Sequence, residues 1–266
     1  MTAVIRSPGL RTDTGLRRRM IGAPTLSVLA AVCALQGGGL AEAASLPGDS
    51  WASIAKLPDM NGIYEITRAG GSGRRPAPAV LSPKADQQQK AYKDAQAKGI
   101  VQDRPTANCL PPGMPAIMSQ PYPIQILLTP GEVTLIQEAY TQVRHIHTDG
   151  RALPADPDLT FNGTSIGRWD GDSLVIETVG FVPEASLVDG VLHSANERIQ
   201  ERLRLVDPDT LEITTQIEDP GVLAQPWTYT TRYARHRDWS IAEYVCEQNN
   251  RNSVDETGKA GIRLGD

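Results

Sequence analysis

The chain has 266 residues and a formal net charge of -5, with 26 basic residues against 31 acidic ones. The basic residues are scattered among the acidic ones, so the basic stripe with which a nucleic-acid-binding protein follows phosphates is missing, and no nucleic-acid partner is expected. A hydrophobic content of 40% over this length is enough for one ordinary domain to bury a core without metal ions or many disulfides.

An export signal is expected over residues 1–43. Three arginines at positions 17–19 precede a short apolar stretch at 20–35, and the small residues around position 43 suit signal peptidase. The arginines loosely resemble a twin-arginine signal, although a Sec signal fits better. Because the apolar stretch is too short to cross a bilayer, no membrane span is expected. Residues 44–266 would form a single mature domain, periplasmic or secreted.

Export decides how the cysteines are interpreted. Cys33 would leave with the signal, so Cys109 and Cys246 would be the only cysteines of the mature chain. A pair in an oxidising compartment is most simply a disulfide, and we predict one between them. A nucleophilic Cys109 is the alternative, but the proline-rich residues that follow it provide no neighbouring base.

Residues 44–122 are predicted to contain a strand, a surface helix and a proline-rich wrap. The strand is expected at 63–67. Ser82 followed by Pro83 is typical of a helix start and Lys98-Gly99 of a helix end, so we expect a helix between them. Its thin apolar stripe indicates a helix that lies on the surface or caps an opening. The dense prolines after it exclude regular structure and favour a wrap held by Cys109.

Residues 123–250 are predicted to form an antiparallel β core, because turn signals separate short alternating segments with no room for helices. Asp170-Gly171 is the strongest hairpin signal, since both central positions of a type I′ turn need a positive φ. We predict an all-β, antiparallel up-and-down barrel of lipocalin or calycin type, with a two-sheet β-sandwich as the alternative and a tail at 251–266. The expected strands are 124–129, 133–140, 143–148, 165–169, 173–178, 198–206, 211–217, 227–235 and 239–245.

A barrel of this size can hold a small ligand, so residues that point inward are the candidate site. Glu201 and Glu243 each share a strand face with apolar residues. A carboxylate in such a place either lines a polar pocket or pairs with an arginine, and Arg144 and Arg232 are the candidate partners. A structural Arg–Glu ladder between strands explains the pattern equally well.

The histidines suggest either proton transfer or metal binding. His145 and His147 share one strand face with the spacing of strand-borne metal sites, and His193, Glu201 or Glu243 would supply a third ligand. Metal is the minority interpretation, and no cofactor is expected. Without metal, either strand histidine is a candidate general base. His193 is expected in a loop at the barrel mouth, where a solvated turn residue is the simpler interpretation.

Aromatic residues bear on the class of ligand. Tyrosine and tryptophan combine an apolar ring with a polar group, which suits an amphipathic or aromatic small molecule. Packing beneath the sheet accounts for these residues equally well. The candidate ligand contacts are Tyr140, Trp169, Trp227, Tyr229 and Tyr233.

Four sequence strings carry a resemblance. They are CLPPG at 109–113, VRHIHTDGR at 143–151, SIGRWDGD at 165–172 and EYVCEQN at 243–249. Together they resemble a broad family of exported, uncharacterised bacterial β-rich proteins, and the resemblance covers nearly the whole mature chain. It implies export and a β-rich fold and carries no activity. Members of that family often have tyrosine at the position of His147, which weakens the interpretation that the whole family shares a metal site there.

Two functions from different classes remain. The first is an exported, cofactor-independent enzyme, a lyase, isomerase or hydratase, that acts on a hydrophobic or aromatic compound. A histidine of the 143–148 strand would move the proton, one of the two glutamates would orient it, and an arginine would stabilise negative charge. The second is a periplasmic, lipocalin-like carrier that binds such a molecule without turnover. Two histidines and two carboxylates on expected inward faces favour the enzyme. The oligomeric state does not follow from the sequence.

Overall fold

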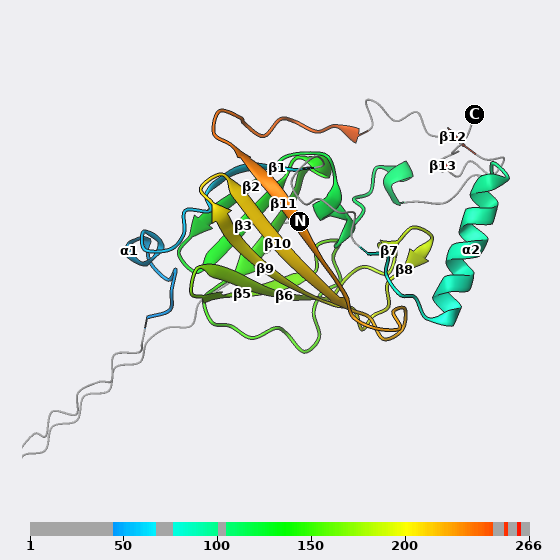
Figure 1. Cartoon of the computed structure of the whole chain (residues 1–266), viewed down its shortest axis with the longest axis horizontal. Coiled ribbons are helices and arrows are strands. Elements are labelled where there is room, and N and C mark those ends of the chain that lie inside the picture. Colours follow the sequence, from blue (N-terminus) through cyan, green and yellow to red (C-terminus); the bar gives the residue numbers. More distant parts are fainter. Residues whose placement is uncertain (1–44, 68–76, 101–104, 247–252, 255–259, 262–266) are drawn as a thin grey trace, which may run out of the picture. The chain divides into compact units, whose positions relative to one another are not determined.

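A computed structural model describes residues 45–67, 77–100, 105–246, 253–254 and 260–261 (Figure 1). The described residues belong to one compact unit. The expected export signal at 1–43 lies outside the described residues, as does most of the expected C-terminal tail.

Nine strands form a closed barrel, which confirms the predicted all-β barrel and excludes the sandwich. The first barrel strand in the sequence pairs with the last one, and the remaining strands follow around the barrel in sequence order. Neighbours in the sheet are therefore nearly always consecutive barrel strands of the sequence. The barrel strands are β1 (Gly62–Ile66), β2 (Ile124–Thr129), β3 (Glu132–Gln137), β4 (Gln142–His147), β5 (Thr164–Asp170), β6 (Ser173–Val179), β9 (Arg198–Asp207), β10 (Thr210–Glu218) and β11 (Trp227–His236).

One pair of strands departs from the predicted up-and-down arrangement. β4 and β5 are parallel, with Ile146 opposite Ser165, whereas every other barrel pair is antiparallel. A closed sheet in which each strand reverses its neighbour needs an even number of strands. With nine strands one parallel pair is unavoidable. The long connection over residues 148–163 returns the chain to the end of the barrel at which β4 began, so that β5 runs in the same direction as β4.

The last predicted strand, over 239–245, is absent, and the reason is the closure of the barrel. β11 pairs with β10 on one edge and with β1 on the other, so no edge is left for a further strand. The segment instead crosses the outside of the barrel, where the Ala242 amide donates to Glu138 and Thr141 donates to the Tyr244 carbonyl. The predicted disulfide between Cys109 and Cys246 is confirmed, with 5.6 Å between the two Cα atoms.

The hairpin between β5 and β6 also differs in detail from the prediction. Asp170 pairs with Ser173, so Gly171 and Asp172 are the central residues of the turn. Only Gly171, at φ 62, has a left-handed conformation. The turn therefore lies one residue later than predicted and is not of type I′, which needs a positive φ at both central positions.

The other elements cover the barrel. The predicted surface helix is confirmed as α2, which begins where the Ser82 hydroxyl accepts from the Ala85 amide. Tyr92 of α2 packs on Gly190, where any side chain would collide with its ring. No helix in the described part of the chain is long and apolar enough to cross a membrane. These elements are α1 (Trp51–Ile54), α2 (Pro83–Ala97), η1 (Pro105–Asn108), η2 (Ala116–Ser119), η3 (Ala139–Thr141), β7 (Ser186–Val188), β8 (Val191–Leu192), β12 (Ser253–Val254) and β13 (Ala260–Gly261).

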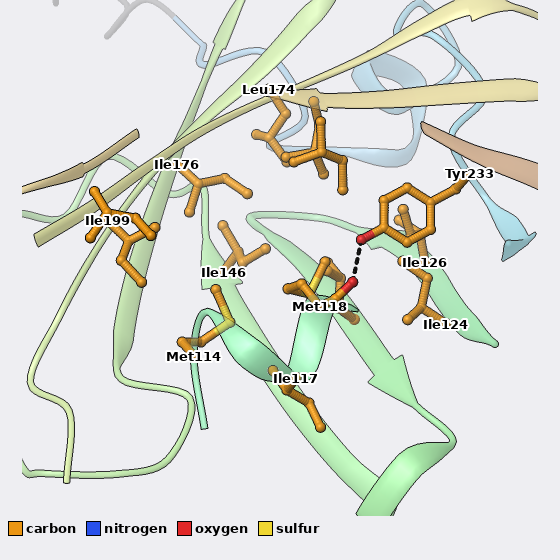
Figure 2. Close-up of a cluster of buried hydrophobic side chains, with 14 of the residues drawn as sticks. Met114, Ile117, Met118, Ile124, Ile126, Ile146, Leu174, Ile176, Ile199 and Tyr233 are labelled. Atoms are coloured by element: carbon orange, nitrogen blue, oxygen red, sulfur yellow. Dashed lines mark hydrogen bonds between the residues drawn. The ribbon is translucent and has the colours of Figure 1, made fainter. Parts of the chain in front are cut away.

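The proline-rich segment closes one end of the barrel. We call this the η2 end; β2, β4, β5, β9 and β11 begin there. Figure 2 shows Met114 near Ile146 and Met118 near the ring of Tyr233, and these four residues belong with Ile117 and Ile199 to one buried hydrophobic cluster. The Tyr233 hydroxyl donates to the Met118 carbonyl at 2.6 Å. Leucine and isoleucine side chains fill the opposite half, so most of the polar side chains that face inward lie toward the η2 end.

Candidate functional site

Arg144 and Glu201 form an ion pair inside the barrel. Both side chains are 1% exposed, and Nη2 of Arg144 lies 2.5 Å from Oε2 of Glu201. Arg144 also donates from Nε to the Ser165 hydroxyl at 3.1 Å and from Nη2 to the Thr178 hydroxyl at 2.7 Å. Of the two arginines considered from the sequence, Arg144 is therefore the partner of Glu201. A buried ion pair is costly to desolvate, so hydrogen bonds of this kind are needed to offset the cost.

Two polar atoms in the same wall lack a hydrogen-bond partner among the described residues. They are Nη1 of Arg144 and Oε1 of Gln137, both buried. Arg144 lies opposite Leu135 and Gln137 opposite Gln142, so the two side chains are diagonal neighbours on the inner faces of β3 and β4. The other amide atom of Gln137, Nε2, faces the sulfur of Met118 at 3.0 Å. The wall therefore offers one spare donor and one spare acceptor beneath the methionines.

Tyrosines and a threonine continue this polar band around the interior. Thr215 lies opposite both Glu201 and Tyr229 in the sheet. Burial raises the pKa of Tyr229 and of Tyr233, and the nearby Glu201 carboxylate raises both further. Both phenols consequently stay protonated at neutral pH and act as hydrogen-bond donors. The ring of Trp227 lies 4.9 Å from that of Tyr229 and extends the band to the η2 end.

The other two candidate aromatic residues lie elsewhere. Trp169 is near the opposite end of the barrel, where Gly48 packs against its indole nitrogen. Tyr140 belongs to η3, and its ring lies 5.1 Å from that of Tyr244, in the crossing segment that ends at Cys246. Neither is part of the polar band.

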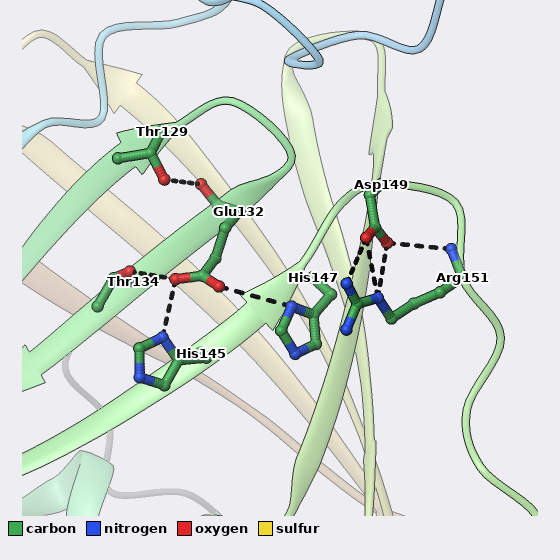
Figure 3. A network of polar contacts seen from close by, with 7 residues as sticks. All are labelled: Thr129, Glu132, Thr134, His145, His147, Asp149 and Arg151. Atoms are coloured by element: carbon green, nitrogen blue, oxygen red, sulfur yellow. Dashed lines mark hydrogen bonds and ion pairs between the residues drawn. The ribbon is translucent and has the colours of Figure 1, made fainter. Parts of the chain in front are cut away.

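His145 and His147 lie on the outer face of β4. Arg144 and Ile146 occupy the buried face, and alternation along a strand then turns both histidines outward. Figure 3 shows Glu132 between them, with Oε1 2.8 Å from Nδ1 of His145 and Oε2 3.5 Å from Nδ1 of His147. The structure thus separates these histidines from Arg144 and Glu201 by the thickness of the sheet. Within the described residues no three His, Cys, Asp or Glu side chains are grouped as a metal site.

The outer contacts lower the pKa of Glu132. Partial burial raises its pKa, but hydrogen bonds from His145 and Thr134 outweigh this effect, and the net pKa is lowered. Glu132 is thus a carboxylate at neutral pH, and the cluster is a hydrogen-bonded surface network.

Arg232 and Glu243 also lie away from the interior. Glu212 holds both Arg204 and Arg232 on the outside of the barrel, at 2.6 and 2.8 Å, so the ladder interpretation applies there. Glu243 is exposed on the segment that follows β11. Of the candidate catalytic residues, only Arg144 and Glu201 meet.

His193 lies at the η2 end in a cluster whose other members the sequence analysis missed. It is 7% exposed and therefore not a solvated turn residue. Buried Glu197 and Asp219 lie beside it, and Asp219 accepts hydrogen bonds from the amide and the hydroxyl of Ser194, both at 2.6 Å. Burial and the charge of Asp219 raise the pKa of Glu197 to about 8. The sequence did contain a signal for Glu197. It precedes Ile199 by two residues and Glu201 by four, so alternation along the strand places all three on the same face.

Comparison with known proteins adds no assignment: no family model matches the chain, and no curated protein does. The site is therefore interpreted from its own geometry.

Proposed function

We propose that the chain binds a small, largely hydrophobic molecule at the η2 end of the barrel, with one polar group of that molecule against Arg144 and Gln137. The supporting observation is the pair of unpartnered buried atoms, Nη1 of Arg144 and Oε1 of Gln137. Leaving such an atom unsatisfied costs about 1–3 kcal/mol, which a ligand or an internal water would recover.

Charge and wall chemistry narrow the class of ligand. Glu201 already neutralises Arg144, so a neutral group suits the site better than an anion. A carbonyl oxygen would accept from Arg144, and an adjacent hydroxyl or N–H would donate to Gln137. Met114 and Met118 supply apolar surroundings, and their flexible side chains adapt to varied shapes. A neutral hydrophobic or aromatic compound with a hydroxy-carbonyl, lactam or amide group fits this description.

Binding without turnover is favoured over the enzyme because His145 and His147 lie far from the site and both ring nitrogens of His193 already face main-chain carbonyls. General acid–base catalysis needs the acid or base within hydrogen-bond reach of the reacting group. His145 and His147 are on the far side of the sheet, and Glu201 is engaged with Arg144. A lipocalin-like carrier is therefore the proposal, in agreement with the barrel fold.

Export to the periplasm or outside the cell belongs to the same proposal. The disulfide between Cys109 and Cys246 supports it, because such bonds persist in oxidising compartments. The basic and apolar pattern before residue 43 supports it independently.

The test is a thermal-shift screen of the purified protein with aromatic and terpenoid ketones, lactones and amides, each beside its matching carboxylic acid. Neutral compounds should raise the melting temperature more than the acids do, and mass spectrometry should recover them unchanged. A compound that is consumed would instead indicate an enzyme. If no compound raises the melting temperature, the proposal is wrong.

Gln137→Leu locates the ligand, because it removes the spare acceptor and keeps the side-chain size. We expect about tenfold weaker binding of the best neutral compound, the cost of one hydrogen bond. Gln216→Leu is the matched control, since Gln216 lies on the outer face of β10 and should leave affinity unchanged. Equal binding by both variants would place the ligand elsewhere.

A further inference from the structure

The ring of His193 has a carbonyl oxygen at each nitrogen. Nε2 lies 2.5 Å from the Val182 carbonyl and Nδ1 lies 3.2 Å from the Ser194 carbonyl. A carbonyl oxygen only accepts, so each contact is a hydrogen bond only when that nitrogen carries a proton. Both contacts together require the doubly protonated, positively charged ring.

A buried carboxyl group faces this ring. Oε2 of Glu197 lies 3.6 Å from Nδ1, and the side chains of His193 and Glu197 are 1% and 0% exposed. Neither carboxyl oxygen has a hydrogen-bond partner among the described residues. An ionised carboxylate that is buried without hydrogen bonds is strongly disfavoured unless a cation or a proton compensates it.

Among the described residues, no other cation is seen to act on Glu197. Asp219, at the end of β10, adds a negative charge. Tyr229 of β11 is close enough for the charge of Glu197 to raise its pKa. The rings of Phe181 and His193 make a T-shaped contact, with 5.8 Å between centroids. Compensation must therefore come from the imidazole or from a proton on the carboxyl group itself.

We propose that His193 and Glu197 form a buried proton-binding site that holds one proton between them and makes the η2 end sensitive to pH. With the proton on Nδ1, the site is an imidazolium–carboxylate pair; with the proton on Glu197, it is a neutral acid beside a neutral ring. The net charge is zero in either form, and the two groups titrate as one unit. This proposal does not depend on the proposed ligand.

Loss of the proton has a structural consequence at this end. The pair joins the Val182 segment, the residues after β8 and the start of β9, and Asp219 follows β10. Release of the proton to solvent leaves an uncompensated negative charge on Glu197 beside Asp219 and removes the donor to the Ser194 carbonyl. The segments that close the η2 end should therefore loosen as the pH rises.

The direction of the pH dependence follows from the number of bound protons. Above about pH 6.5 an unfolded chain holds no proton on either group, whereas in the folded chain the raised pKa of Glu197 keeps one proton in the site up to about pH 8. Stability therefore falls with rising pH across this window. The equilibrium constant for unfolding should rise by about tenfold per pH unit from this site alone.

The test is urea unfolding of the full chain from pH 6 to 9 for wild type, Glu197→Gln and Glu218→Gln. Glutamine imitates the neutral acid but does not titrate. Glu197→Gln should therefore lose the tenfold rise in the unfolding equilibrium constant per pH unit, and it should be more stable than wild type at pH 9. Glu218→Gln is the control, because Glu218 is exposed on the outer face two strand positions from Gln216 and should keep the wild-type slope. Equal slopes for wild type and Glu197→Gln would overturn the proposal.

A second measurement covers the case in which Glu197→Gln fails to fold. In wild-type protein, the ring ¹⁵N signals of His193 and the carboxyl ¹³C signal of Glu197 should shift together, in one step near pH 8. Two separate steps, or a Glu197 carboxyl that ionises near its ordinary pKa without any change at His193, would rule out a shared proton.

Discussion

At the scale of single residues, the Arg144–Glu201 pair determines the character of the barrel interior. Both side chains are almost fully buried, and the hydroxyls of Ser165 and Thr178 hold Arg144 in place while bonding to each other at 3.0 Å. Removing one charge leaves the other buried and unpaired, whereas removing both avoids this cost.

Arg144→Met is therefore expected to lower the free energy of unfolding by about 3–5 kcal/mol, because Glu201 loses its only buried counter-ion among the described residues. Adding Glu201→Leu should recover most of the loss, since Ser165 and Thr178 still satisfy each other. Urea unfolding of the single and the double variant measures both. A double variant that is less stable than Arg144→Met would mean that the ion pair itself stabilises the fold.

The outer histidine contacts should contribute much less. His145 is 56% exposed, and exposed ion pairs contribute at most about 1 kcal/mol. We expect His145→Gln to change the free energy of unfolding by less than about 0.5 kcal/mol at pH 7. Because the pKa of Glu132 is lowered in the folded state, its ionised form stabilises the fold at neutral pH, and this stabilisation is lost as the carboxylate is protonated. Wild type should therefore lose slightly more stability than the variant between pH 6 and 3. A large loss at pH 7 would mean that His145 has a further role.

At the scale of elements, the disulfide connects two segments that belong to no barrel strand. Cys109 follows η1 and Cys246 ends the segment that crosses the outside of the barrel, 137 positions later in the sequence. Tyr244 of that segment lies between Tyr122 and Tyr140, with ring centroids 5.3 and 5.1 Å apart. The disulfide and this tyrosine cluster hold the crossing segment without the help of a β ladder.

Replacing both cysteines with serine should lower the free energy of unfolding by about 2–5 kcal/mol, the range for a native disulfide that closes a long loop. Chemical reduction of wild type should have an effect of the same size. The measurement is urea unfolding with and without reductant, and the double serine variant should not respond to the reductant. If reduction leaves wild-type stability unchanged, the disulfide does not constrain the unfolded chain appreciably.

At the scale of the whole molecule, closure of the barrel explains both departures from the predicted topology. An odd number of strands requires one parallel pair, and it falls at β4 and β5, where the chain has a connection long enough to return. The same closure leaves no edge for the segment 239–245, although its alternating pattern is that of a strand. An alternating pattern indicates that a segment can form a strand. The strand forms only if another strand has an unpaired edge to which it can hydrogen-bond.

The same distinction applies to the candidate site. Parity along the sequence places Glu201 on an apolar face and pairs His145 with His147 on one face, and both groupings hold in the structure. Which face of each strand turns inward follows from the burial of its apolar residues against the rest of the molecule. On β4 the exposed Val143 lies on the histidine side and Ile146 lies on the buried side with Arg144, so the short apolar pattern was ambiguous.

The sequence alone was sufficient to predict the β-barrel class, helix α2 with its start at Ser82, the disulfide and most strand positions, because turn residues, capping residues and alternation act over a few neighbouring residues. Only the tertiary structure decided which arginine meets Glu201, that Glu243 is exposed, and that Glu197 and Asp219 lie beside His193. These contacts join strands and loops far apart in the chain. Their formation depends on the closed sheet, which no local pattern specifies.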